Sequence, residues 1–247
     1  MKKLLLFAFF LIFYANCRFT QSTKLHTQEV KVLKEIWNKT RVLDWDFDKD
    51  PCSLEGDWLY SVDCNCSFDG NTTCRVTRIY LEGNMLSGPF PTTLTKMTTL
   101  QTLVLEGNHF SGPIPKEIAN LTYMKELDLS SNDFTGELPS GVANLTKLTT
   151  LRLSGNNFTG KIPSFIEKWT RIEKLHIQGC SFEGPIPSSI SRLIHLQDLR
   201  ISDLKGGAST FPSLAKMQEL NTLVLRNCFI HGKVPNYVGD MKELNTL

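Results

Sequence analysis

The sequence predicts an α/β solenoid in which each coil adds one strand to a parallel sheet. Three observations support this fold: a motif recurs every 24 residues without slippage, apolar and polar residues alternate inside it, and Gly and Ile-Pro positions follow it. Alternation with a period of two places the apolar residues inside and the residues between them outside. Two apolar columns define the strands: Ile79, Leu103, Leu127, Leu151, Leu175, Leu199, Leu223 and Leu81, Leu105, Leu129, Leu153, Ile177, Ile201, Leu225.

A third column follows each strand, where the chain must turn sharply. A buried amide side chain there can bond the backbone groups that the turn leaves unpaired, and a thiol can still donate weakly and pack like a small hydrophobe. The repeat LxxLxLxxN-x-F-x-G-x-I/L-P is the leucine-rich-repeat consensus in its 24-residue, plant-type form. The column consists of Asn84, Asn108, Asn132, Asn156, Cys180, Leu204 and Cys228.

The second half of each coil carries two further apolar columns, predicted to form short helical or 3₁₀ turns on the outer side of the solenoid. The sixth repeat keeps its length but loses the Asn, Phe and Gly of the consensus. Two interpretations remain for it: a drifted coil, or a mobile loop at Lys205-Gly206-Gly207 beside a binding surface. The outer columns are Leu94, Ile118, Val142, Ile166, Ile190, Leu214, Val238 and Met97, Leu121, Leu145, Trp169, Leu193, Met217, Met241.

The chain divides into three predicted regions. Residues 1–17 read as a secretory signal peptide, with Lys2-Lys3 before an apolar run that is too short to span a bilayer. Residues 18–75 form an N-terminal cap, and residues 76–247 form seven repeats and the truncated start of an eighth. Because Leu244-x-x-Leu247 opens a strand and stops inside it, we expect a fragment or a truncated gene product.

The cap should cover the open end of the solenoid. A helix is predicted over 24–40, with Val30, Leu33, Ile36 and Trp37 on its apolar stripe. In an oxidising compartment the four clustered cysteines are expected to form two disulfides, with three connectivities possible, and a zinc site is much less favoured. Pairing of Cys64 with Cys66 would strain the bond, and Cys180 and Cys228, two coils apart, should stay free thiols. The clustered cysteines are Cys52, Cys64, Cys66 and Cys74.

Six Asn-x-Ser/Thr sites are candidates for N-glycosylation in a secreted chain. Asn120 and Asn144 are 24 residues apart in one column on the predicted outer side. Asn65 lies between two cysteines and is the weakest candidate. The six sites are Asn38, Asn65, Asn71, Asn120, Asn144 and Asn157.

The sequence carries no constellation that indicates catalysis, so we expect no enzyme activity, no cofactor and no metal site in this chain. Asp46-x-Asp48-x-Asp50 resembles the start of a calcium loop, but Pro51 stands where the loop requires Gly, so cap structure is the better interpretation. Removal of the signal peptide takes two of the 27 basic residues, which leaves 25 bases against 25 acids. A mature net charge of zero gives no support for binding to nucleic acid or to anionic membranes.

The outward positions of the concave sheet are the predicted ligand-binding surface. They divide along the solenoid into an acidic half and a mainly basic half. One interpretation is an ordinary solvated sheet face. The other is a dipolar groove for an extended or charged ligand, a peptide, a protein or an acidic cell-wall saccharide. The candidate residues are Glu106, Glu126, Asp128, Arg152, Lys174, His176, Arg200 and Arg226.

Several segments resemble plant leucine-rich-repeat receptor-like serine/threonine kinases. They are the cap from Trp37 to Asp50-Pro51-Cys52, the Cys64-Asn65-Cys66-Ser67-Phe68 segment and the repeats themselves. The irregular coil Ile201-Ser202-Asp203-Leu204 and the following Leu223–Cys228 stretch resemble the subfamily that has a malectin-like domain after its repeats.

The resemblance implies a sensing region at the extracellular face of the plasma membrane or in the cell wall, a possible co-receptor, and a membrane span and kinase that this chain lacks. A free secreted repeat protein that inhibits enzymes or acts as a scaffold in the cell wall is the alternative. Neither the ligand nor the co-receptor follows from the sequence.

Overall fold

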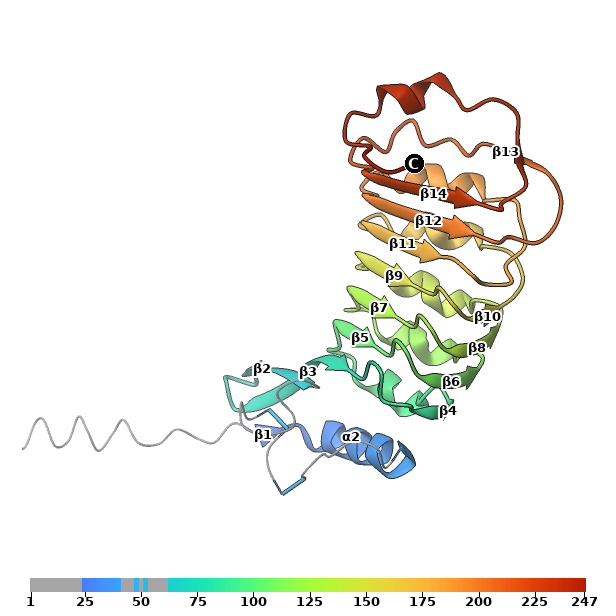
Figure 1. Ribbon diagram of the computed structural model, residues 1–247. Helices are drawn as coiled ribbons and strands as arrows, with labels where there is room; N and C mark the ends of the chain where they lie inside the picture. The colour runs from blue at the N-terminus through green and yellow to red at the C-terminus, as the bar shows by residue number, and fades with distance from the viewer. Residues whose placement is uncertain (1–23, 41–46, 49–50, 53–61) are drawn as a thin grey trace, which may run out of the picture.

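The computed structural model describes residues 24–40, 47–48, 51–52 and 62–247 (Figure 1). The predicted signal peptide and two acids of the Asp46-x-Asp48-x-Asp50 run lie outside these ranges. The repeats stack as a curved solenoid, and the cap lies at one end of the stack (Figure 1).

The main sheet confirms the predicted stacking of repeats. Within the described residues it has nine strands in the order β1-β3-β5-β7-β9-β11-β12-β14, with β2 antiparallel to β3 and all other pairs parallel. The registers match the 24-residue spacing, as in Leu103 opposite Leu127, Leu127 opposite Leu151 and Leu151 opposite Leu175. The strands are β1 (Lys24–Leu25), β2 (Val62–Phe68), β3 (Thr73–Tyr80), β5 (Thr102–Val104), β7 (Glu126–Asp128), β9 (Thr150–Arg152), β11 (Lys174–Ile177), β12 (Asp198–Ser202) and β14 (Thr222–Arg226).

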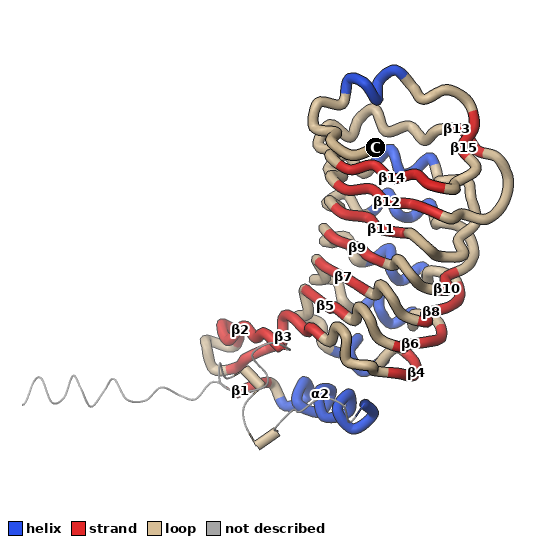
Figure 2. The backbone as a smooth tube through the Cα atoms, in the orientation of Figure 1, coloured by secondary structure: helices blue, strands red, loops and turns tan. Residues whose placement is uncertain are grey.

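A second, shorter sheet runs along one flank (Figure 2). Segments at the Phe-x-Gly position of the first four repeats, with Leu86 in place of Phe in the first, form its strands in the order β10-β8-β6-β4. We did not predict this sheet, because its strands are too short to show alternation. Its strands are β4 (Ser87–Pro89), β6 (His109–Gly112), β8 (Asp133–Gly136) and β10 (Asn157–Phe158), and β13 (Ser209–Thr210) pairs separately with β15 (Ile230–His231).

The outer turns are 3₁₀ helices, as predicted. Each follows a proline, whose fixed φ suits the entry to a turn. The sixth repeat has no such helix within the described residues, and its Leu214 lies in an irregular segment. The helices are η1 (Thr92–Lys96), η2 (Lys116–Asn120), η3 (Ser140–Asn144), η4 (Ser164–Lys168), η5 (Ser188–Arg192) and η6 (Asn236–Asp240).

The sixth repeat nevertheless continues the stack. Leu204 is buried in the place of the consensus amide. Lys205 N–H donates to the Phe182 carbonyl at 2.7 Å, and the Lys205 carbonyl accepts from Gly184 N–H at 2.6 Å. These bonds favour the drifted-coil interpretation over a mobile loop.

The core is one continuous column of aliphatic side chains flanked by a ladder of phenylalanines. Phe110, Phe134, Phe158 and Phe182 are fully buried, and successive ring centroids lie 6.1, 6.1 and 5.9 Å apart in stacked geometry. Burial of these rings contributes much of the stability of the repeats, since each ring removes about 150–250 Å² from water.

The asparagine column bonds the backbone of two coils, as its position predicts. Asn132 Oδ1 accepts from Phe110 N–H at 3.0 Å, and its Nδ2 donates to the carbonyls of Leu105, Leu129 and Ser130. Cys180 and Cys228 fill the same column as free thiols, each donating through Sγ to a backbone carbonyl. Burial raises the pKa of each thiol to about 11.

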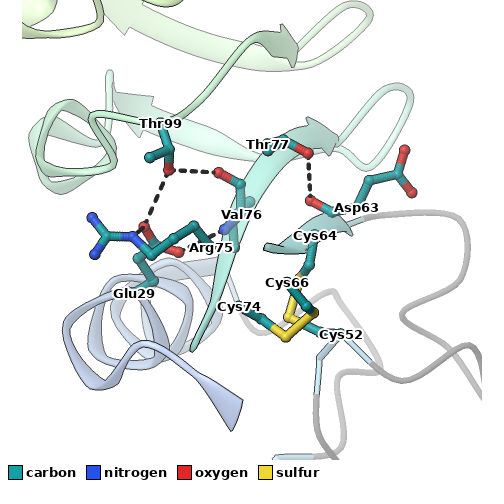
Figure 3. The surroundings of a disulfide bond; sticks show 10 residues. All are labelled: Glu29, Cys52, Asp63, Cys64, Cys66, Cys74, Arg75, Val76, Thr77 and Thr99. Carbon is teal, nitrogen blue, oxygen red and sulfur yellow. Dashed lines mark hydrogen bonds and ion pairs between the residues drawn. A yellow bond between two sulfur atoms is a disulfide. The ribbon is translucent and has the colours of Figure 1, made fainter. Parts of the chain in front are cut away.

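The cap contains two disulfides, Cys52–Cys64 and Cys66–Cys74, one of the three connectivities that the sequence allowed (Figure 3). The helix α2 spans Thr27–Thr40, and residues 24–25 form β1 rather than its first turn. Its buried apolar residues, among those whose side chains are described, are Val32, Leu33 and Ile36, whereas the predicted stripe residues Val30 and Trp37 are only half-buried. The observed apolar stripe therefore shares Leu33 and Ile36 with the predicted one but includes Val32 in place of Val30 and Trp37.

A buried carboxylate joins this helix to the first repeat (Figure 3). Glu29 is 1% exposed; it accepts from Val76 N–H at 2.6 Å and from Arg75 Nε at 2.9 Å. Burial raises the pKa of Glu29 despite these donors. The sequence pattern missed this contact because its partners are 46 and 47 residues away.

Candidate ligand-binding face

The candidate residues lie on the main sheet, where register places them in columns across neighbouring strands. Asp128, Arg152, His176 and Arg200 stand opposite one another on β7, β9, β11 and β12. Glu126 and Lys174 belong to the adjacent column, separated by Thr150. The sequence therefore predicted correctly which residues share this face, because they follow from strand alternation and the repeat length alone.

The first charged group in this face joins Arg152 to two acids. Arg152 Nη1 lies 3.1 Å from Asp128 Oδ2 and 3.7 Å from Glu126 Oε1. The Asp128 side chain is 1% exposed and also accepts from Ser130 N–H at 3.0 Å. This corrects the prediction for Asp128: its carboxylate is covered by its neighbours, so it orients Arg152 instead of contacting a ligand.

The second charged group centres on Asp198, which was not among the candidate residues. Arg200 donates to both of its carboxylate oxygens, from Nε at 2.8 Å and from Nη2 at 3.1 Å. His176 Nε2 lies 2.9 Å from Asp198 Oδ2, but the geometry of this contact is not that of a hydrogen bond. Asp198 could have been found from the sequence, because it lies two residues before Arg200 on the same strand face.

In this second group, burial and the oppositely charged neighbours have opposing effects on each pKa, and the pKa values of both His176 and Asp198 are lowered. Burial lowers the pKa of His176, and the attraction of Asp198 does not fully compensate. For Asp198 burial alone would raise the pKa, but the hydrogen bonds from Arg200 and the contact with His176 outweigh burial, and the pKa is lowered. Asp198 is therefore the ionised partner that holds Arg200 in place.

The remaining candidates are more open. Glu106 is exposed and its pKa is raised, first by partial burial and then by the charge of Asp128. Within the described residues no carboxylate lies within ion-pair distance of Lys174. Arg226 is 74% exposed and approaches Asp203 at 3.3 Å. Acids and bases are therefore mixed within the two predicted halves. Arg152 and Arg200 form ion pairs with acids, whereas Glu106 and Lys174 have no oppositely charged partner within ion-pair distance in the described residues.

A polar cluster beside β14 includes the predicted residue Arg226 together with Asp203 and Asn227, which were not predicted as part of the surface. Asp203 accepts from Ser202 Oγ, from Arg226 Nη2 at 3.3 Å and from Asn227 Nδ2 at 3.2 Å. Asp203 and Asn227 occupy the position that is glycine in most other repeats, with φ values of 60° and 51°. Asp and Asn tolerate this left-handed conformation better than other side chains, which allows a polar cluster at the turn.

The six candidate glycosylation sites are all exposed where the structure describes them. Asn120 and Asn144 end the helices η2 and η3, on the outer side as predicted. Asn65 accepts from Ser67 N–H at 2.9 Å through its side-chain oxygen. Exposure makes each site accessible, and their occupancy stays a prediction.

Neither a metal cluster nor a membrane span is found in the described part of the chain. No group of three His, Cys, Asp or Glu side chains there is arranged to hold a metal ion. None of the helices in the same ranges has both the length and the apolar composition needed to cross a bilayer.

Comparison with known proteins relates the chain to plant receptors. A probable LRR receptor-like serine/threonine-protein kinase of Arabidopsis thaliana is 43% identical over a region covering 38% of this chain and 10% of the kinase. The chain thus spans about a tenth of the length of that relative.

Two crystal structures of the Arabidopsis receptor kinase HAESA share the fold. The HAESA LRR ectodomain with an N-terminally extended IDA peptide hormone ligand superimposes with a TM-score of 0.76 at 27% identity, over 88% of this chain and 36% of that one. HAESA in complex with IDA and the co-receptor SERK1 gives a TM-score of 0.77 at 26% identity, over 89% and 37% of the two chains. The family described as a leucine-rich repeat region matches residues 72–200. Since that match covers more than half of the chain, the protein belongs to the leucine-rich-repeat family.

Proposed function

We propose that this chain is the extracellular ligand-sensing region of a plant receptor-like serine/threonine kinase, and that its concave sheet binds a peptide or protein. The observation that carries the proposal is the ordered set of charged side chains across β7, β9, β11 and β12. The similarity to HAESA, solved with a peptide hormone and with a co-receptor, supports this class of ligand.

The arginines of this face suit recognition because their orientation is already restrained. Arg152 is held by Asp128 and Arg200 by Asp198, so little side-chain entropy is lost when a ligand contacts their remaining N–H groups. Each guanidinium has five N–H donors, and its acid partner uses only some of them. Lys174 and Glu106 supply uncompensated charges of opposite sign for an extended ligand with both acidic and basic groups.

The finer assignments rest on resemblance and on the position of the sites. We place the chain in the malectin-containing subfamily, with residues 1–17 as a signal peptide, 18–75 as the cap and 76–247 as the repeats. Glycans at Asn120 and Asn144 would cover the outer side and leave the concave sheet bare. The site of action is the outer face of the plasma membrane or the cell wall.

Binding assays with charge-swapped variants test the concave face. The probes are synthetic secreted plant peptides and purified co-receptor ectodomains, applied to the secreted, glycosylated chain. In any complex found, the double variant Glu106→Lys, Lys174→Glu should weaken binding roughly tenfold or more, about 1.4 kcal/mol, because two attractions become repulsions.

The matched control is Lys116→Glu, Glu117→Lys on η2, which leaves the net charge equally unchanged but lies on the outer side. Equal weakening by both swaps, or no binding of any probe, would refute the concave-face proposal. Sequencing the transcript beyond the codon for Leu247 tests the receptor assignment separately. A membrane span and kinase motifs support it, and a stop codon after a closing cap favours the free secreted inhibitor or scaffold.

A further inference from the structure

An open groove of about 610 Å³ lies on the outer side of the solenoid, across the ends of η4 and η5 and the irregular turn of the sixth repeat. We call it the outer groove. Its charged lining consists of Lys168, Arg192, Lys216 and Glu167, and the exposed Ile194 adds an apolar patch. It is separate from the concave residues, none of which lines it.

The three bases of the outer groove recur at one position of the repeat. Lys168, Arg192 and Lys216 are 24 residues apart in successive coils, so each coil presents one positive charge to the same groove. All three are exposed, and in the described ranges none has a carboxylate within 4.0 Å, the ion-pair limit. The lining has three bases and one acid, Glu167, so its net charge is about +2.

This arrangement contrasts with the concave face, where Arg152 and Arg200 are matched by acids. Two arginines of the predicted basic half of the concave face are paired with acids there, whereas the row of bases on the outer side is unpaired within the described residues. A regular row of unmatched charges fits a ligand whose own charges recur at regular intervals.

The same repeat position holds other residues in the two coils that precede the groove. In the second and third repeats the column holds Asn120 and Asn144, both glycosylation candidates, and in the fourth to sixth it holds the three bases. Occupied sequons would shield the column beside the groove and leave the basic part open.

The lining favours a saccharide among possible polyanions. It has no aromatic side chain on which nucleic-acid bases could stack. It consists of 3₁₀ and irregular segments instead of a free strand edge, so it cannot hold a peptide by strand addition. Ser191 Oγ donates to the Ser188 carbonyl at 2.8 Å, which leaves its oxygen free to accept from a sugar hydroxyl.

We propose that the outer groove binds a linear acidic polysaccharide carrying one carboxylate per sugar, as a uronic-acid polymer does. The inference goes beyond the peptide recognition proposed above and uses different residues. It describes a second contact, one that would hold the protein against an acidic matrix while the concave face stays open.

The experiment measures binding of an unesterified oligogalacturonide to the secreted chain by calorimetry at low and at physiological salt. The groove variant is Lys168→Gln, Arg192→Gln, Lys216→Gln. Each exposed charge contributes a factor of roughly two to five, so the groove variant should bind roughly tenfold to a hundredfold more weakly. Binding of the parent protein should fall as salt rises, because the charges are exposed and screened.

The matched control is Lys96→Gln, Lys116→Gln, Lys242→Gln, which removes the same charge from exposed positions outside the groove. It should bind like the parent protein, and the fully methyl-esterified, neutral oligomer should not bind. Failure of the parent protein to bind the acid form, equal weakening by the two triple variants, or tighter binding of poly-glutamate would each overturn the proposal. None of these outcomes bears on the concave-face variants.

Discussion

Replacement of Asn132 by alanine tests how the repeats are held in register. The side chain is 7% exposed and connects two coils through one accepted and three donated contacts. Its amide has two protons for three carbonyls, so the contacts amount to about three full hydrogen bonds. At roughly 1 kcal/mol each, Asn132→Ala should lower the free energy of unfolding by about 3 kcal/mol.

A cysteine at the same position should be milder, since the protein itself places cysteine in this column. Cys180 Sγ donates to the Leu153 carbonyl at 3.3 Å. Asn132→Cys should therefore keep one donor but lose the acceptor for Phe110 N–H, at a cost of about 2 kcal/mol.

Denaturant unfolding followed by circular dichroism measures both variants, with Thr135→Ala, an exposed neighbour, as control. Solenoids can lose cooperativity, so unchanged m-values must accompany the comparison. A loss below 1 kcal/mol for Asn132→Ala, or a larger loss for cysteine than for alanine, would refute the reasoning.

Two further predictions concern titratable groups. Burial lowers the pKa of His176 below its ordinary value of 6.5, so the unfolded chain takes up the proton first and stability should fall as pH drops from about 6.5. In His176→Gln, unfolding free energies measured at pH 7 and pH 5 should differ less than in the parent protein; an identical difference would contradict the assignment. Cys180 and Cys228, with pKa values raised to about 11 by burial, should resist a disulfide-exchange reagent at pH 8 and react only in denaturant. Rapid labelling of either thiol in the folded protein, detected by mass spectrometry, would show that the column is open.

The fold followed from the sequence because a solenoid is a local structure repeated. Strand alternation and a constant repeat length place Leu103, Leu127 and Leu151 in one column without any knowledge of distant contacts. The same reasoning identified the buried amides, the free thiols Cys180 and Cys228 and the residues that share the concave face.

The tertiary structure decided what those shared positions do. Burial of Asp128, its pairing with Arg152, and the place of Asp198 between Arg200 and His176 depend on side-chain packing between coils, which spacing does not encode. The pairing of the cap cysteines depends on how β2 folds back on β3. The outer groove was missed because its three bases are visible as a column in the sequence, whereas the space between the turns and the lack of a carboxylate within ion-pair distance, among the described residues, are visible only in the structure. Periodicity determines which residues are neighbours, and packing and solvation decide which of those neighbours remain available to a ligand.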